Sequence, residues 1–396
     1  MALEVIAAPG APYGSRATRG MRHTPGPHQR YTSLPEIDVG RDPAASSGEH
    51  GVVPALLAQA EADGSVRCVA CAHRCLIRPG RRGICMVREN RGGQLVSLVY
   101  GEAVAAALEP IEKKPFFHVA PGSLAFSIAT RGCNFHCRFC QNWAISQADR
   151  LGLRPEAIPL EPDQVVEQAR AGGARSIAYT YIEPTVFIEY VVDTARLAHR
   201  AGLLNLLVTN GYQTPEALDV LAPLMDGANV DLKGFSDRFY RRVCGARLSP
   251  VLDALVGMRT RGMWVEVTTL LVPGMNDDRT DLEALARWLV AELGAETPWH
   301  VSRFFPAYQM ADAAATPLRT IVEAAEIGRQ AGLRHVYPGN VAGVVETHCA
   351  GCGETLIRRS DFTVLGNRLQ DGSCPLCGRR LPGLHLAEHA QMATAS

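Results

Sequence analysis

The sequence predicts an α/β protein whose core, residues 121–345, is a partial or complete barrel of parallel strands, each followed by a helix. Short apolar segments alternate with helical segments at least six times, and such alternation is typical of parallel strands with right-handed crossovers. The strand segments are nearly continuous apolar runs, as in a sheet with helices packed against it. A doubly wound open sheet is the alternative, and in either case ligands gather at the carboxyl ends of the strands.

The core elements follow in order along the chain. Apolar and β-branched runs predict strands at 124–130, 176–181, 203–211, 228–234, 264–274, 298–306 and 335–340. Helical periodicity, with Pro215 and Glu216 as one favourable start, predicts the intervening helices at 161–173, 186–202, 214–227, 249–262, 279–294 and 317–332.

Smaller segments flank this core. Residues 1–50 are rich in Pro, Gly, Ser and Arg, a composition that predicts a disordered tail. We expect a second tail at 386–396. Residues 51–120 form a module with four cysteines, in which we expect a helix at 52–62, a strand at 94–101 and a proline-broken connection at 109–122. Residues 346–385 form a turn-rich, cysteine-containing knuckle.

Composition excludes several classes of protein. The 396 residues include 40 basic and 40 acidic side chains, so the chain lacks the positive field of a general nucleic-acid binder. No apolar run is long enough to span a membrane, and the N-terminus lacks the charged start of a secretory signal. We therefore expect a cytoplasmic protein with neither a nucleic acid nor a membrane as partner.

Twelve cysteines are the main chemical signal. Eleven lie in three clusters of short spacing, which in a cytoplasmic chain indicates metal ligation rather than disulfides. The central cluster is RGCNFHCRFCQNW at 131–143, directly after the first core strand, and it supplies Cys133, Cys137 and Cys140. A four-iron cluster normally takes four thiolates, so three would leave one iron open. Zinc, with His136 as fourth ligand, is the alternative.

These residues resemble the radical S-adenosylmethionine (SAM) superfamily. More narrowly, residues 66–385 resemble the radical SAM member of the AmmeMemoRadiSam system, a group similar to the pyruvate formate-lyase activating enzymes. The likeness rests on the central motif together with SLVYG, PIEKKPFFH, SIAYTYIEPT, VTNGY, NVDLKGF, WVEVTTLLVPG and PWHVSRFFPAY. It implies that the open iron binds SAM and that an electron from the [4Fe–4S] cluster cleaves SAM to a 5′-deoxyadenosyl radical.

The resemblance also implies residues that hold SAM. Glu183 stands where family members carry a Gly-Gly-Glu motif for the SAM amino group, although the two glycines are absent here. Its alternative role is an acid at a helix start. Lys233, in the Asp-Leu-Lys stretch, matches a lysine near the SAM carboxylate. The other candidates at strand ends are Thr209, Asn210, Asp231, Thr268, and the possible adenine wall of Phe305, Pro306 and Tyr308, for which a core role is the alternative.

The two outer cysteine sets differ in spacing. Two CxxC pairs beside glycines, Cys349 with Cys352 and Cys374 with Cys377, are typical of a structural zinc ribbon; an iron–sulfur cluster is the alternative, and His348 flanks the site. Cys68, Cys71, Cys75 and Cys85 could hold zinc, which we favour slightly, or a second [4Fe–4S] cluster. The nearby arginines that could offset thiolate charge are Arg74, Arg78, Arg81, Arg82 and Arg88.

The leading prediction is a radical SAM enzyme that takes electrons from a donor such as flavodoxin or ferredoxin and acts on an unidentified substrate. By analogy with the activating enzymes, that substrate could be a partner protein. The alternatives are a zinc-dependent scaffold or binding protein with cysteine knuckles, and a degenerate enzyme that binds SAM without turnover. Cys244 stands apart from the clusters, as a buried small hydrophobe or, alternatively, a hydrogen-atom donor.

Overall fold

A computed structural model describes residues 50–386, so the predicted tails fall almost wholly outside the described residues. The core is an eight-stranded sheet in the order β16-β15-β14-β13-β12-β11-β9-β8. Its strands are β8 (Ala105–Pro110), β9 (Leu124–Ala129), β11 (Ser176–Tyr179), β12 (Leu204–Thr209), β13 (Gly227–Asp231), β14 (Trp264–Leu271), β15 (Trp299–Arg303) and β16 (Val336–Gly339).

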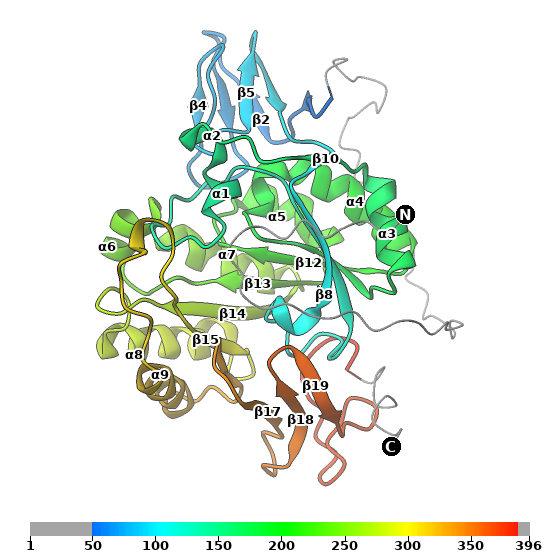
Figure 1. Ribbon diagram of the computed structural model, residues 1–396, viewed down its shortest axis with the longest axis vertical. Coiled ribbons are helices and arrows are strands. Elements are labelled where there is room, and N and C mark those ends of the chain that lie inside the picture. The colour runs from blue at the N-terminus through cyan, green and yellow to red at the C-terminus, as the bar shows by residue number, and fades with distance from the viewer. Residues whose placement is uncertain (1–49, 387–396) are drawn as a thin grey trace.

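Seven of these strands run parallel, and their order along the sheet follows their order in the sequence. A doubly wound sheet would reverse its strand order at a switch point, so the sequential order indicates a partial barrel. The sheet ends at β16 and β8, which do not pair with each other among the described residues. The predicted α/β class is confirmed (Figure 1).

Amphipathic helices connect the parallel strands and bury their apolar stripes against the sheet. They are α3 (Pro162–Ala171), α4 (Ile188–Arg200), α5 (Pro215–Leu221), α7 (Ser249–Thr260), α8 (Arg279–Trp288) and α9 (Leu318–Gln330). Local chemistry sets their starts: Thr214 caps α5 by accepting from the Ala217 N–H, and Asp278 caps α8. No helix among residues 50–386 is long and apolar enough to cross a membrane.

Strand β8 lies inside the segment assigned to the N-terminal module, yet it pairs antiparallel with β9 over six residues. This strand was not predicted from the sequence, because its alanine-rich stretch has weak β-propensity and pairing with a distant strand decides its structure. The 3₁₀ helix η1 (Ile111–Lys113) follows it. The core sheet therefore begins near residue 105 of the chain.

The N-terminal module consists of two small sheets. β1 (Val53–Pro54) pairs with β6 (Gln94–Ser97), which also pairs with β5 (Arg88–Arg91); β2 (Ala58–Ala60), β3 (Val66–Cys68) and β4 (Leu76–Ile77) form the other. The helix predicted over 52–62 is wrong, because β1 and β2 occupy that segment. Pro54 interrupts a helix there, and strand partners outside the segment satisfy its backbone.

The two cysteine-bearing appendages lie at opposite ends of the barrel (Figure 1). The N-terminal module covers the carboxyl ends of the strands, where the Ala72 N–H donates to the Tyr212 carbonyl and the Thr214 hydroxyl donates to the Val69 carbonyl. The C-terminal strands β17 (Val344–His348), β18 (Thr355–Ser360) and β19 (Thr363–Asn367) pack near the amino ends.

A buried polar network joins this C-terminal unit to the barrel. The His118 ring contacts the Pro382 carbonyl and the Tyr337 hydroxyl, each at 2.7 Å. Arg359, fully buried, donates to Thr347 and to the Phe117 carbonyl. These hydrogen bonds hold the knuckle against the barrel and offset part of the cost of burying the polar groups.

Candidate functional site

Residues 131–143, here called the cluster loop, leave the carboxyl end of β9 and carry Cys133, Cys137 and Cys140. Backbone hydrogen bonds hold the loop on several sides. The Gly132 N–H donates to the Ile145 carbonyl at 2.9 Å, and the Arg138 N–H donates to the Val243 carbonyl at 3.0 Å. These bonds hold the loop at the strand ends where the sequence predicted it.

The three thiols of the cluster loop are buried or half-buried. Burial raises the pKa of the Cys133 thiol, and it raises the pKa of Cys140 to about 11. At Cys137 a hydrogen bond with the Cys244 thiol, followed by burial, raises the pKa well above its usual value. Thiols of this kind become thiolates when a metal takes the place of the proton, which suits them as cluster ligands.

Cys244 does not stand apart from the clusters in space, as its isolation in the sequence suggested. It ends the π-helix η4 (Tyr240–Cys244), it is fully buried, and its thiol contacts that of Cys137. Its carbonyl also accepts from the His136 N–H at 2.8 Å. A residue more than a hundred positions away therefore forms part of the wall behind the cluster loop, which spacing alone could not reveal.

Glu183 is the centre of a hydrogen-bond network beside the cluster loop. Its buried carboxylate accepts from the Asn210 N–H at 2.8 Å, from the Thr209 hydroxyl at 2.8 and 3.0 Å, and from Thr185 and Gln213. Burial raises its pKa, against the effect of these bonds. Because the chain itself supplies this many donors, the geometry favours the helix-start role for Glu183 over direct contact with SAM.

The network reaches the cluster loop through Asn134, the residue after Cys133. The Asn210 side chain donates to Asn134 Oδ1 at 2.7 Å. Asn134 Nδ2 and Gln213 Oε1 are buried without a hydrogen-bond partner, unlike most buried polar groups. An unpaired donor and acceptor beside three cluster thiols fit a site that receives a polar ligand. Sequence reasoning did not single out Asn134 or Gln213.

Asp231 ends β13, Lys233 follows it, and both face the other side of the cluster loop. Their side chains form an ion pair at 2.9 Å, and the Lys233 ammonium lies 5.8 Å from the centre of the Phe139 ring. Burial works to lower the pKa of Lys233, but Asp231 and the nearby Cys137 outweigh it and raise the pKa. Thr268 instead donates to Asn229 within the sheet, at 2.8 Å.

Two aromatic residues stack where the cluster loop ends. The rings of Trp143 and Tyr308 stack, with centroids 5.4 Å apart and planes 11° from parallel. The Gln309 N–H also donates to the Arg138 carbonyl at 3.0 Å, so the turn after β15 lies on the cluster loop. Phe305, a second candidate for an adenine wall, is 41% exposed and lies against Arg303 instead.

Sequence reasoning also missed a polar trio made of Glu109, Lys114 and Tyr181. The Tyr181 hydroxyl donates to Glu109 at 2.5 Å, and Lys114 forms an ion pair with the same carboxylate. Burial lowers the pKa of Lys114 to about 8. Tyr181 has a left-handed backbone, with φ of 64°, and its carbonyl accepts from Asn142 of the cluster loop. Strain of this kind in a bulky residue is often found at functional sites.

The C-terminal cysteines form a compact centre. All four thiols lie within 4.8 Å of one another, with Cys349–Cys377 at 3.5 Å and Cys352–Cys374 at 3.6 Å. Tetrahedral zinc with Zn–S bonds of about 2.3 Å requires sulfurs about 3.8 Å apart, so the set fits that ion. Burial works to raise the pKa of Cys349, but hydrogen bonds from the Cys352 and Gly351 N–H groups lower it to about 7.

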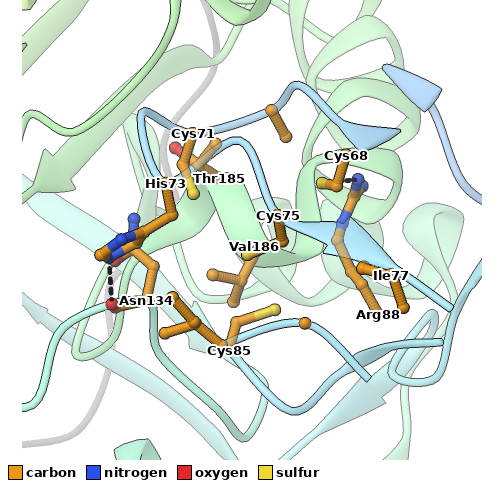
Figure 2. A pocket seen from close by; sticks show the side chains of 13 residues that line it. Cys68, Cys71, His73, Cys75, Ile77, Cys85, Arg88, Asn134, Thr185 and Val186 are labelled. Carbon is orange, nitrogen blue, oxygen red and sulfur yellow. Dashed lines mark hydrogen bonds between the residues drawn. The ribbon is translucent and has the colours of Figure 1, made fainter. Parts of the chain in front are cut away.

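The N-terminal cysteines are also brought together, around a cavity (Figure 2). Of the five arginines considered beside them, Arg88 reaches the set: it donates to Cys68 Sγ at 3.4 Å. Arg74 and Arg82 instead pair with Glu216 and Glu89 at the surface. His348, near the other set, faces Glu346 and Thr355.

The chain is similar to several known proteins. The model of the radical SAM superfamily matches residues 127–289. The uncharacterized protein MJ0808 of Methanocaldococcus jannaschii is 41% identical over 326 residues, which cover 81% of this chain and 96% of that protein. An isethionate sulfite-lyase activating enzyme of Oleidesulfovibrio alaskensis is 30% identical over 174 residues, 42% of this chain and 55% of that enzyme. A solved radical SAM methyltransferase from Sphaerobacter thermophilus has a TM-score of 0.44 and 18% identity, over 55% of this chain and 66% of its own.

The chain therefore belongs to the radical SAM superfamily. Membership implies SAM and a [4Fe–4S] cluster as its cofactors and radical chemistry as its reaction type.

Proposed function

We propose that Cys133, Cys137 and Cys140 hold the [4Fe–4S] cluster and that the protein uses it to cleave SAM reductively. The observation that supports this most directly is the braced three-thiol loop at the carboxyl end of β9, beside buried polar atoms without partners. When bound, the cluster would supply the one electron that cleavage of SAM to methionine and a 5′-deoxyadenosyl radical requires, and this radical would be the species that takes a hydrogen atom from the substrate.

The chain's own residues would bind and orient SAM. Lys233 supplies a half-buried cation for the SAM carboxylate, and the stacked Trp143 and Tyr308 rings supply a surface for adenine. Glu183 acts as a positioning residue, because its hydrogen bonds hold Asn210 against Asn134. The braced walls around the loop, including buried Cys244, restrict water near the reactive carbon.

The finer parts of the proposal concern partners. We propose a partner protein as the substrate, which the similarity to an isethionate sulfite-lyase activating enzyme supports. We also propose a flavodoxin or ferredoxin as the electron donor. The twelve free cysteines of this chain suit a reducing compartment such as the cytoplasm. We propose zinc for the C-terminal set, because its thiols already lie at the separations of a tetrahedral site.

Anaerobic reconstitution, followed by dithionite and SAM, tests the function. The protein should release 5′-deoxyadenosine, and SAM should change the electron paramagnetic resonance spectrum of the reduced cluster. Cys140→Ala should abolish both results. Cys352→Ser, which removes a thiol of the C-terminal set, should release zinc instead. An intact cluster that yields no 5′-deoxyadenosine contradicts the proposal and favours a SAM binder without turnover.

A further inference from the structure

We propose that Cys68, Cys71, Cys75 and Cys85 bind a second [4Fe–4S] cluster, rather than zinc, and that this cluster delivers electrons to the one in the cluster loop. The metal assignment is independent of the proposed function. The electron-delivery role rests on the proposed function.

The first support is the space between the four thiols. They line one cavity, partly open to solvent, and Figure 2 shows their sulfur atoms directed into it. Apolar side chains, including Ile77 and Val186, form much of the remaining wall. A cavity lined by a thiol from each of four positions suits a four-iron cluster, in which each iron takes one protein thiolate.

The second support is the contrast between the two four-cysteine sets of the same chain. The C-terminal thiols are close enough for one tetrahedral ion, with contacts of 3.5 and 3.6 Å. Within residues 50–386, the N-terminal thiols are not gathered to the 4.8 Å spacing that marks the C-terminal set. In a four-iron cluster each thiolate binds a different iron, so its sulfurs stand farther apart than those around zinc.

The third support is a buried cation in the cavity wall. Arg88 is 1% exposed, donates to Cys68 Sγ at 3.4 Å and pairs with Glu189. Its Nε atom has no hydrogen-bond partner, although Arg88 lines the cavity. A cluster with four thiolates is negatively charged, and a hydrogen-bonding cation beside a sulfur stabilises it and raises its reduction potential.

The loops that carry the two thiol sets contact each other. A Cβ built on Gly132, the residue before Cys133, would lie 2.7 Å from the Cys85 carbonyl oxygen. The His73 ring, in the cavity wall, contacts the Asn134 carbonyl at 2.9 Å. Arg150 donates to the Ile84 carbonyl and lies within electrostatic reach of both Cys85 and Cys133. The cavity and the cluster loop therefore share one wall.

This arrangement gives the second cluster a route for electrons. One electron would enter from a reduced flavin- or iron–sulfur-containing protein, and one would leave for the cluster loop, so the second cluster returns to its oxidised state. No bond forms or breaks there, because all four irons carry a protein thiolate. Its position in the outer module places it between solvent and the barrel (Figure 1).

The full chain with Cys133, Cys137 and Cys140 all changed to Ala isolates the second site. After anaerobic reconstitution we expect about four irons per chain and a reduced-state paramagnetic signal that SAM does not alter, against about eight irons in the unmodified protein. A triple variant that is folded and contains zinc at both four-cysteine sets but no iron overturns the metal assignment. This result says nothing against SAM cleavage, which is tested on the unmodified chain.

Single substitutions locate the second cluster. Cys75→Ser should lower the iron content to about four per chain and leave the SAM-sensitive signal in place. The matched change Cys352→Ser should leave iron unchanged and lower zinc. If either cysteine variant fails to fold, Arg88→Gln combined with Glu189→Gln removes both buried charges without removing a thiol. In the triple-variant background it should lower the reduction potential of the remaining signal, and an unchanged potential contradicts the location.

Rapid mixing with a reduced flavodoxin tests the electron-delivery role. The SAM-sensitive cluster should be reduced at least about ten-fold more slowly in Cys75→Ser than in the unmodified chain, which corresponds to about 1.4 kcal/mol in the activation barrier. Dithionite anions are small enough to reach the cluster loop directly, so they should reduce the SAM-sensitive cluster in both proteins. Equal rates with flavodoxin refute electron delivery.

Discussion

Replacement of Gly132 by Ala tests whether the cluster loop truly rests on the N-terminal cysteine module. Gly132 has a φ of 89°, a left-handed conformation that costs an alanine about 1–2 kcal/mol. A Cβ there would lie 2.6 Å from Val87 Cγ1 and 2.7 Å from the Cys85 carbonyl oxygen. Overpacking of this kind costs about 1–3 kcal/mol, and more where the neighbour is backbone. We expect a loss of about 2–5 kcal/mol in the free energy of unfolding.

Gly152→Ala is the matched control. Gly152 has a φ of 68°, but a Cβ there would meet nothing within 4 Å, so only the conformational cost of about 1–2 kcal/mol remains. Urea unfolding, followed by circular dichroism, measures both variants, and iron content after reconstitution reports on the loop itself. We expect Gly132→Ala to lose more stability and more iron than Gly152→Ala. Equal losses in the two variants would show that Gly132 does not pack against the backbone of the N-terminal cysteine module.

Three further outcomes follow from buried groups. Glu183→Gln places an amide donor against N–H and hydroxyl groups that already donate, so it should lower the free energy of unfolding by about 1–3 kcal/mol. Urea titration measures this loss, and calorimetry should show weaker SAM binding. An unchanged affinity for SAM contradicts the positioning role of Glu183. Burial lowers the pKa of His118 to about 3 in the folded chain, against 6.5 when unfolded, so stability is complete above about pH 6.5 and falls as the pH drops toward 3. His118→Gln should flatten that part of the pH–stability curve, and an unaltered slope would assign it to other groups. Cys244→Ala should keep its cluster-loop iron and its 5′-deoxyadenosine yield, because three thiolates remain; loss of SAM cleavage would show that the contact with Cys137 is required.

Much of the core was predictable because its signals are local. The apolar runs that became β9, β11, β12, β13, β14 and β15 are short, and capping residues such as Thr214 mark the helices between them. The segment at 52–62 shows where local signals fail. Its apolar residues suit a helix or a strand, and pairing with β6 and β3 decided the outcome.

The candidate site divides in the same way. Spacing alone indicated Cys133, Cys137 and Cys140 as a set, because all three lie on one loop whose reach is a few residues. It could not show that Cys244 lies against Cys137, nor that Asn134 and Gln213 have buried atoms without partners. These facts depend on contacts between segments far apart in the chain.

The sequence by itself determined the class of fold, the three cysteine clusters and the chemistry expected of the central one, since each follows from residue types within a short window. Only the tertiary structure decided how the clusters relate. It placed one four-thiol set at zinc separations and the other around a cavity with Arg88 in its wall. It also placed that cavity against the cluster loop, because packing of the outer module on the strand ends, and not spacing along the chain, sets the distance between Cys85 and Gly132.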